Sequence, residues 1–137
     1  MCSDKHPVKE KLITEEYYRD TQFESVYVDL RINVLDALVA LLTGESYNVK
    51  RYESKEFAQK LVSILKEDTF DVIHVESIFL TPYLSLIRKY SEAKVVLRAH
   101  NVEHLIWARI ARCTKNIFKR WYIKKLALAL RVYELEH

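Results

Sequence analysis

Apolar residues recur with two different periods along the chain, and these periods predict strands and helices. Residues 70–77 and 94–99 have nearly continuous apolar centres, which is typical of strands covered on both faces in a parallel sheet. Residues 80–90 between them repeat apolar positions at helical spacing, and Pro82 falls in the first turn, where proline is tolerated. A strand, a helix and a strand within about 30 residues predict a right-handed βαβ unit.

Further strands and helices are predicted before this unit. Residues 25–30 alternate and are rich in strand-forming side chains, so we expect another strand there. Asn33 can cap a helix through Leu42, with Gly44 as its natural stop. This helix is apolar almost all round, and we therefore expect it to be well buried. Residues 54–66 predict a second helix, capped by the serine at its start.

Three segments carry other patterns. Residues 7–22 are polar with one apolar edge, which favours a short helix. Residues 45–53 combine β-propensity with many polar side chains, and we interpret them as an ordered loop. Residues 105–133 repeat apolar positions at helical spacing, with a break at 113–116, and predict a long C-terminal helical region.

Composition limits the class of protein. At 137 residues, half of them hydrophobic, the chain suits one domain with a sizeable core. Gly44 is the single glycine, whereas nucleotide-binding α/β domains normally use several in their turns, so we expect an incomplete domain. Cys2 and Cys113 are far apart and predict free thiols in a reducing compartment. The C-terminal residues 135–137 resemble the start of a vector-encoded tag, and we expect them to be an expression remnant.

Polar side chains follow both predicted strands of the βαβ unit. Glu76 and Ser77 end the first strand, Arg98 lies in the second, and His100 and Asn101 follow it. Because ligands of open α/β sheets bind beyond the carboxyl ends of the strands, we expect these residues to line one cleft. The alternative is that Glu76 and Arg98 form a structural pair and that His100 only caps the next helix.

Two further histidine patterns need an interpretation. His74 lies mid-strand between apolar neighbours, which favours a hydrogen-bonded core histidine. Residues 100–104 match H-x-x-E-H, a zinc-peptidase motif in which two histidines one helical turn apart hold the metal. The apolar run before His100 predicts a strand instead of the required helix, and the main candidate for a third ligand is Glu134. A zinc peptidase is therefore a less favoured alternative, and we give His104 a structural role at the helix start.

The C-terminal helical region has a basic face with two interpretations. The first is a solvated face, and the second is attraction to an anionic membrane surface, which aromatic side chains could assist. We expect these aromatic side chains in the core, because they lie on the apolar stripe, and we expect no nucleic-acid partner. The basic residues are Arg112, Lys115, Lys119, Arg120, Lys124, Lys125 and Arg131, and the aromatic ones are Trp107, Phe118, Trp121 and Tyr122.

Six blocks of sequence carry a family resemblance. The blocks are Tyr47–Tyr52, Phe70–Ser77, Pro82-Tyr83, Val96–Arg109, Tyr122 and Tyr133-Glu134. Together they resemble the N-terminal half of a bacterial group 1 (family 4) glycosyltransferase. The resemblance covers about 26–134, and Arg-Ala-His-Asn-Val-Glu-His at 98–104 is its most specific part.

The resemblance implies a GT-B fold, in which two Rossmann-like domains face a cleft. The N-terminal domain of such an enzyme holds the acceptor, and the C-terminal domain holds the nucleotide-sugar. The resemblance also implies that His100 lies beside the reacting sugar and that Asn101 and Glu103 shape its loop. The candidate site residues are His100 as the catalytic residue and Glu76, Ser77, Arg98, Asn101 and Glu103 as substrate-binding residues.

We therefore expect an α/β chain whose residues 1–134 form an incomplete Rossmann-like three-layer domain, with a mostly parallel sheet and a long C-terminal helix. The parent enzyme would transfer a sugar from a nucleotide-sugar to a glycan or lipid-linked acceptor, without a cofactor or a metal. The chain itself would be inactive, because the donor domain lies outside it.

The sequence also predicts where the chain is located and how it associates. We expect the chain in the cytoplasm, or peripherally at the inner face of the membrane. We expect it to dimerise through exposed strand edges. A non-catalytic α/β module whose polar strand ends bind a partner is the main alternative function.

Overall fold

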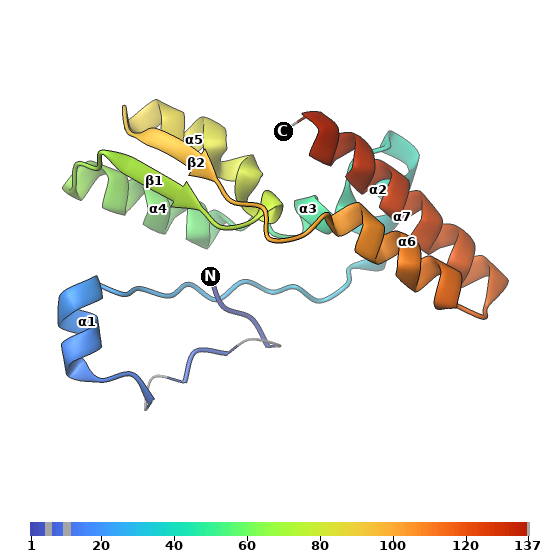
Figure 1. The fold of residues 1–137 in the computed structure, drawn as a ribbon, viewed down its shortest axis with the longest axis horizontal. Coiled ribbons are helices and arrows are strands. Elements are labelled where there is room, and N and C mark those ends of the chain that lie inside the picture. Colours follow the sequence, from blue (N-terminus) through green and yellow to red (C-terminus); the bar gives the residue numbers. More distant parts are fainter. Residues whose placement is uncertain (5–6, 10–11, 137) are drawn as a thin grey trace.

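The structure, a computed structural model, describes residues 1–4, 7–9 and 12–136. It is a mixed α/β chain in which helices predominate, and a small parallel sheet lies beside a helical hairpin (Figure 1). The strands are β1 (Val72–Val75) and β2 (Lys94–Leu97). The helices are α1 (Glu15–Thr21), α2 (Val34–Thr43), α3 (Tyr47–Lys50), α4 (Lys55–Glu67), the 3-10 helix η2 (Ile78–Tyr83), α5 (Leu84–Tyr90), α6 (Glu103–Cys113) and α7 (Ile117–Glu136).

The predicted strand–helix–strand unit is confirmed. β1 and β2 pair in parallel, with Val72 opposite Lys94 and Val75 opposite Leu97. The connection between them contains η2 and α5, so Pro82 lies in a 3-10 turn ahead of the α-helix. The backbone N–H of Arg98 donates to Val75 O at 2.8 Å, which extends the pairing to the carboxyl ends of both strands.

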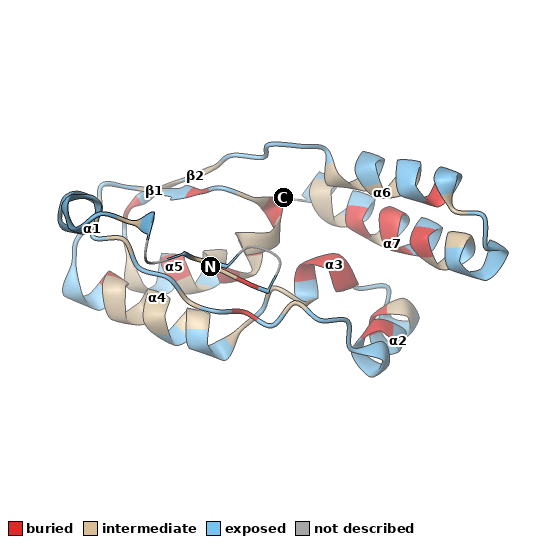
Figure 2. Ribbon diagram, turned by 90° about the horizontal axis from the view of Figure 1, so that it is seen from below, coloured by how far each residue is buried: buried red, intermediate tan, exposed pale blue. Residues whose placement is uncertain are grey.

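Helices cover only one face of this sheet (Figure 2). On that face Val75 forms a buried cluster with Leu65 of α4 and Ile87 of α5. On the opposite face Val72 is 52% exposed and Val96 is 43% exposed. The prediction of strands covered on both faces is therefore wrong, because no second layer of the described chain packs there.

The expected incomplete Rossmann-like three-layer domain does not form. The sheet that the described residues build has two strands, and residues 25–30 are not among them. That segment makes one isolated bridge, Tyr27 with Cys2, through two backbone hydrogen bonds of 2.8 Å. A strand needs a hydrogen-bonded neighbour along its length, and alternation in the sequence does not supply one.

The helix boundaries that depend on local capping are confirmed. Asn33 Oδ1 accepts from the N–H of Leu35 at 3.0 Å, and Gly44 ends α2 with a φ of 79°, in the left-handed region that glycine favours. Ser54 Oγ accepts from the N–H of Phe57 at 3.2 Å and starts α4.

Two helical segments differ from the expectation in burial or in structure. α2 buries only Ala37 and Ala40, and all of its larger apolar side chains except Leu41 are exposed, so the expectation of a well-buried helix is wrong. The segment expected to be an ordered loop contains the short helix α3. Tertiary packing explains α3, because Tyr47 lies in a buried cluster with both alanines and Leu126.

The first and last elements are close to their predicted places. α1 occupies part of the predicted helix at 7–22, of which residues 10–11 lie outside the described residues. Thr14 caps it, with Oγ1 accepting from the N–H of Tyr17 at 3.2 Å. At the other end α7 includes Leu135 and Glu136, which were expected to be a tag remnant, whereas residue 137 is not described.

α6 and α7 form a helical hairpin with the predicted break between them (Figure 1). Ala111 and Leu130 are fully buried in it. The expectation that the aromatic stripe is core is wrong for Phe118 and Trp121, which are exposed near the turn of the hairpin. Among the described helices, including the 20-residue α7, none combines the length and apolarity needed to cross a bilayer.

Candidate functional site

The carboxyl ends of β1 and β2 bring Glu76 and His100 together. Parallel neighbouring strands end at the same edge of a sheet, so residues 24 positions apart in sequence meet there. His100 Nε2 lies 2.7 Å from Glu76 Oε2. The expected meeting of these two side chains is observed, and their role in a reaction stays a prediction.

Glu76 is the centre of a small surface cluster. Its Oε1 lies 3.2 Å from His74 Nδ1 and 3.8 Å from Arg98 Nη1, while its Oε2 contacts His100. The Glu76 side chain is 46% exposed and that of His100 is 49% exposed, so the cluster is open to solvent on the sheet edge. Open exposure leaves room for a ligand to reach both side chains.

The hydrogen bond from His100 lowers the pKa of Glu76 below its ordinary 4.5, and the positive charge of Arg98 lowers it further. Glu76 is therefore ionised at neutral pH, and an ionised carboxylate only accepts hydrogen bonds. It consequently selects the form of His100 that carries a proton on Nε2. In the neutral ring this leaves Nδ1 as the acceptor that can bind a hydroxyl group.

His74 is not the core histidine that was expected. It does hydrogen-bond to Glu76, but its side chain is 52% exposed on the open face of the sheet. The apolar neighbours in sequence, Ile73 and Val75, point to the opposite, helix-covered face. Strand alternation therefore explains its position, and the missing second layer explains its exposure.

Three predicted site residues lie apart from this cluster. Ser77 Oγ accepts from the N–H of Phe79 at 3.3 Å and caps η2. Asn101 is exposed in the loop before α6, and Glu103 begins that helix. In the described part of the chain, none of the three forms a hydrogen bond or ion pair with Glu76 or His100, so the site is smaller than expected.

Glu134 is a structural partner that the sequence did not reveal. Its Oε1 accepts from the N–H of Glu103 at 2.7 Å and its Oε2 from the N–H of His104 at 3.3 Å. The same carboxylate pairs with His104 Nδ1. Val102 at the N-cap of α6 has no side-chain cap of its own, so a carboxylate from the end of α7 fills that place. His104 therefore has the structural role at the helix start that was expected.

The H-x-x-E-H segment does not have the geometry of a zinc peptidase. α6 begins at Glu103, so His100 lies in the preceding loop and not one helical turn from His104. The two imidazoles pair with different carboxylates, Glu76 and Glu134. Within residues 1–4, 7–9 and 12–136, no three potential metal ligands come together.

A hollow of about 540 Å³ lies away from the strand ends, between α3, η2 and α7. None of the six predicted site residues lines it. Its polar lining includes Ser46, Lys50, Glu53 and Tyr133. This hollow is therefore not the cleft that the five strand-end residues were expected to line, and the Glu76 cluster is a separate surface site.

Comparison with protein-family models, with curated proteins and with solved structures found no match to this chain.

Proposed function

We propose that the chain is the acceptor-side part of a nucleotide-sugar-dependent glycosyltransferase, with His100 beside the reacting sugar. The observation that carries the proposal is the 2.7 Å contact between His100 and Glu76 at the carboxyl edge of a parallel βαβ unit. Ligands of α/β sheets bind at this edge. The resemblance of residues 98–104 to family 4 glycosyltransferases supports the assignment of the chemistry.

The reaction is a displacement at the anomeric carbon of the donor sugar. The acceptor hydroxyl oxygen forms a bond to that carbon, the bond from the carbon to the phosphate oxygen breaks, and the hydroxyl proton passes to the departing phosphate. The nucleotide departs with the electron pair of the broken bond. A second, nucleotide-sugar-binding domain supplies the donor in this proposal.

Each member of the cluster has a part in positioning the sugar. Glu76 accepts from His100 Nε2 and orients the ring, as a hydrogen-bonded carboxylate does for many functional histidines. His100 Nδ1 is then free to accept from a sugar hydroxyl. The guanidinium of Arg98, 63% exposed, contributes positive charge near the site where the anionic leaving group develops.

The test is transfer of labelled sugar from UDP- and GDP-sugars to a lipid-linked acceptor, with this chain joined to its donor-binding domain. We expect His100→Ala to lower kcat by about 100-fold, since misplacing a reacting group by about 1 Å can cost about 10²-fold in rate. His74→Ala is the matched control, because it removes the other imidazole on Glu76 and leaves the His100 contact intact. Transfer at the wild-type rate by His100→Ala would overturn the proposal and leave the non-catalytic binding module.

A further inference from the structure

The turn of the α6–α7 hairpin exposes three large apolar side chains within five positions. Ile117 is 69% exposed, Phe118 is 85% exposed and Trp121 is 54% exposed. Single exposed apolar residues are ordinary, but neighbouring ones form a patch that indicates a binding surface. The patch is at the free end of the hairpin, far from the sheet (Figure 1).

The patch continues along α7 as a second apolar face. Leu128 and Val132 are each about half exposed and lie on the same side of the helix as Trp121, at spacings of seven and eleven residues. Ile123 and Leu130 lie on the other side and are buried. α7 therefore has one apolar face for its own core and one that the described chain leaves open.

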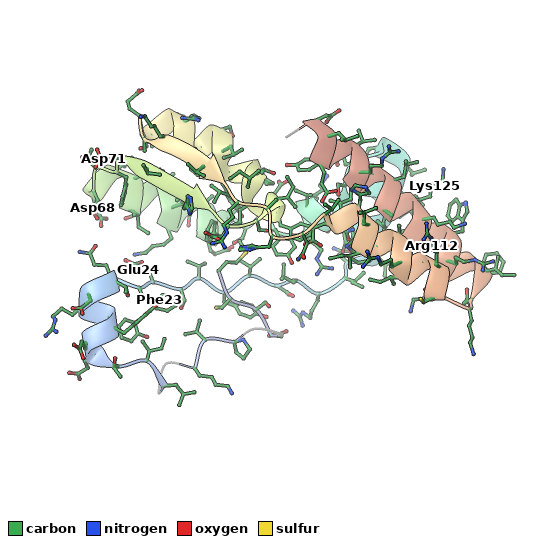
Figure 3. The ribbon with its side chains drawn as sticks, in the orientation of Figure 1. Phe23, Glu24, Asp68, Asp71, Arg112 and Lys125 are labelled. Atoms are coloured by element: carbon green, nitrogen blue, oxygen red, sulfur yellow. The ribbon has the colours of Figure 1, made fainter. Side chains whose placement is uncertain are left out.

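Charge is distributed very unevenly between this hairpin and the rest of the chain. Residues 104–133 contain eight Lys and Arg and no Asp or Glu, which leaves 14 Lys and Arg against 19 Asp and Glu elsewhere, a formal charge of −5. Figure 3 shows Glu24, Asp68 and Asp71 at the opposite end of the molecule from Arg112 and Lys125. The chain is thus polarised: residues 104–133, which carry the exposed apolar patch, are cationic, and the rest of the chain has a net negative charge.

We propose that the turn of the α6–α7 hairpin docks on an anionic phospholipid surface. Ile117, Phe118 and Trp121 insert at the level of the lipid headgroups, and the surrounding lysines and arginines contact the phosphates. The acidic end of the molecule is repelled by the same surface and points away from it. This inference does not rest on the glycosyltransferase proposal, although it would place a lipid-linked acceptor close to the chain.

Other occupants of the patch fit the observations less well. Residues 104–133 carry eight cations and no carboxylate, so two copies of this part of the hairpin repel each other, which disfavours a second copy of the chain. Nucleic acid would satisfy the cations and could stack on Trp121, but Ile117 and Leu128 offer no ring to stack on a base. A bilayer surface satisfies both the cations and the aliphatic side chains.

The test is sedimentation of the chain with vesicles. We expect at least about ten-fold tighter binding to vesicles with roughly 30% phosphatidylglycerol than to pure phosphatidylcholine at about 0.1 M salt, because each cation near the surface adds to the attraction. Phe118→Ser should weaken binding by about ten-fold, because it removes the most exposed apolar side chain of the patch. A double substitution of Lys119→Gln and Arg120→Gln should weaken it by about as much.

Two controls separate docking from non-specific adsorption. Leu35→Ser removes a side chain that is 73% exposed on α2, outside the basic hairpin, and should leave vesicle binding unchanged. Trp121→Phe should abolish the blue shift of tryptophan emission that anionic vesicles cause, because Trp107 packs against the core. Circular dichroism checks that each variant is folded.

Three results would overturn the inference. Equal binding to neutral and anionic vesicles is the first, and equal weakening by Leu35→Ser and Phe118→Ser is the second. The third is failure to bind vesicles together with tight binding to duplex DNA that Phe118→Ser does not weaken, which would assign the surface to nucleic acid.

Discussion

At the scale of single residues, the Glu76 carboxylate contacts three side chains, two of which are distant from it in the sequence. Arg98 and His100 contact its carboxylate because two strands end at one edge, and His74 contacts it from two positions earlier on β1. The sequence was sufficient to predict that Glu76 and His100 lie close together, because the apolar pattern predicted both strands and where each one ends. It could not show that Ser77 would turn away to cap η2, because that depends on how the chain leaves the strand.

Glu76→Gln should make the stability of the chain less dependent on pH. The pKa of Glu76 is lowered in the folded state, first by the hydrogen bond from His100, so its contribution is fully present above pH 4.5 and is lost as the pH falls through the folded value. Urea unfolding at pH 7 and at pH 3 measures this. We expect the difference in unfolding free energy between the wild type and Glu76→Gln to shrink at pH 3. A difference that is the same at both pH values would contradict the assignment.

At the scale of elements, features fixed by neighbours in sequence were predictable and features fixed by distant partners were not. The caps at Asn33 and Ser54 and the stop at Gly44 need only adjacent backbone groups, and they are all present. The strand at 25–30 and the burial of α2 both require a partner that the pattern alone cannot guarantee. The apolar pattern of α2 is the same whether or not another layer covers it.

The start of α6 depends on Glu134, a partner that is distant in the sequence, and this dependence can be tested. Glu134→Ala should cost about 1–3 kcal/mol of unfolding free energy, because it leaves the N–H groups of Glu103 and His104 without their acceptor. Amide hydrogen exchange should accelerate at these two positions. Glu136→Ala is the matched control, since it removes an exposed carboxylate from the same end of α7. Unchanged exchange at Glu103 and His104 in Glu134→Ala would show that the contact does not stabilise the helix start.

At the scale of the whole molecule, the open sheet face and the outer face of α2 leave much apolar surface in contact with water. A three-layer domain would have covered the sheet face with helices. The sequence indicated α/β correctly from the parallel βαβ unit, but the number of layers depends on tertiary contacts that periodicity does not encode. The expected dimerisation through exposed strand edges stays a prediction.

Association of the chain should therefore depend on its concentration. Each of the two strands has one edge that is unpaired in the described residues. Val96 of β2 is exposed on the sheet face that the helices do not cover. Val96→Lys should weaken association by about ten-fold, because it places a charge on the open sheet face. Sedimentation equilibrium measures the effect. A wild-type chain that remains monomeric at high concentration would refute the expectation.

The carboxylate of Glu134 also connects the end of α7 to the start of α6. α7 has 20 residues and is therefore about 30 Å long, with Phe118 at its free end and Glu134 at the end fastened to the start of α6. The fastened backbone begins three residues after His100. If α7 tilts, it must either move the backbone of Glu103 and His104 with it or break their hydrogen bonds to Glu134. A force on the turn of the hairpin therefore acts on the loop that contains His100.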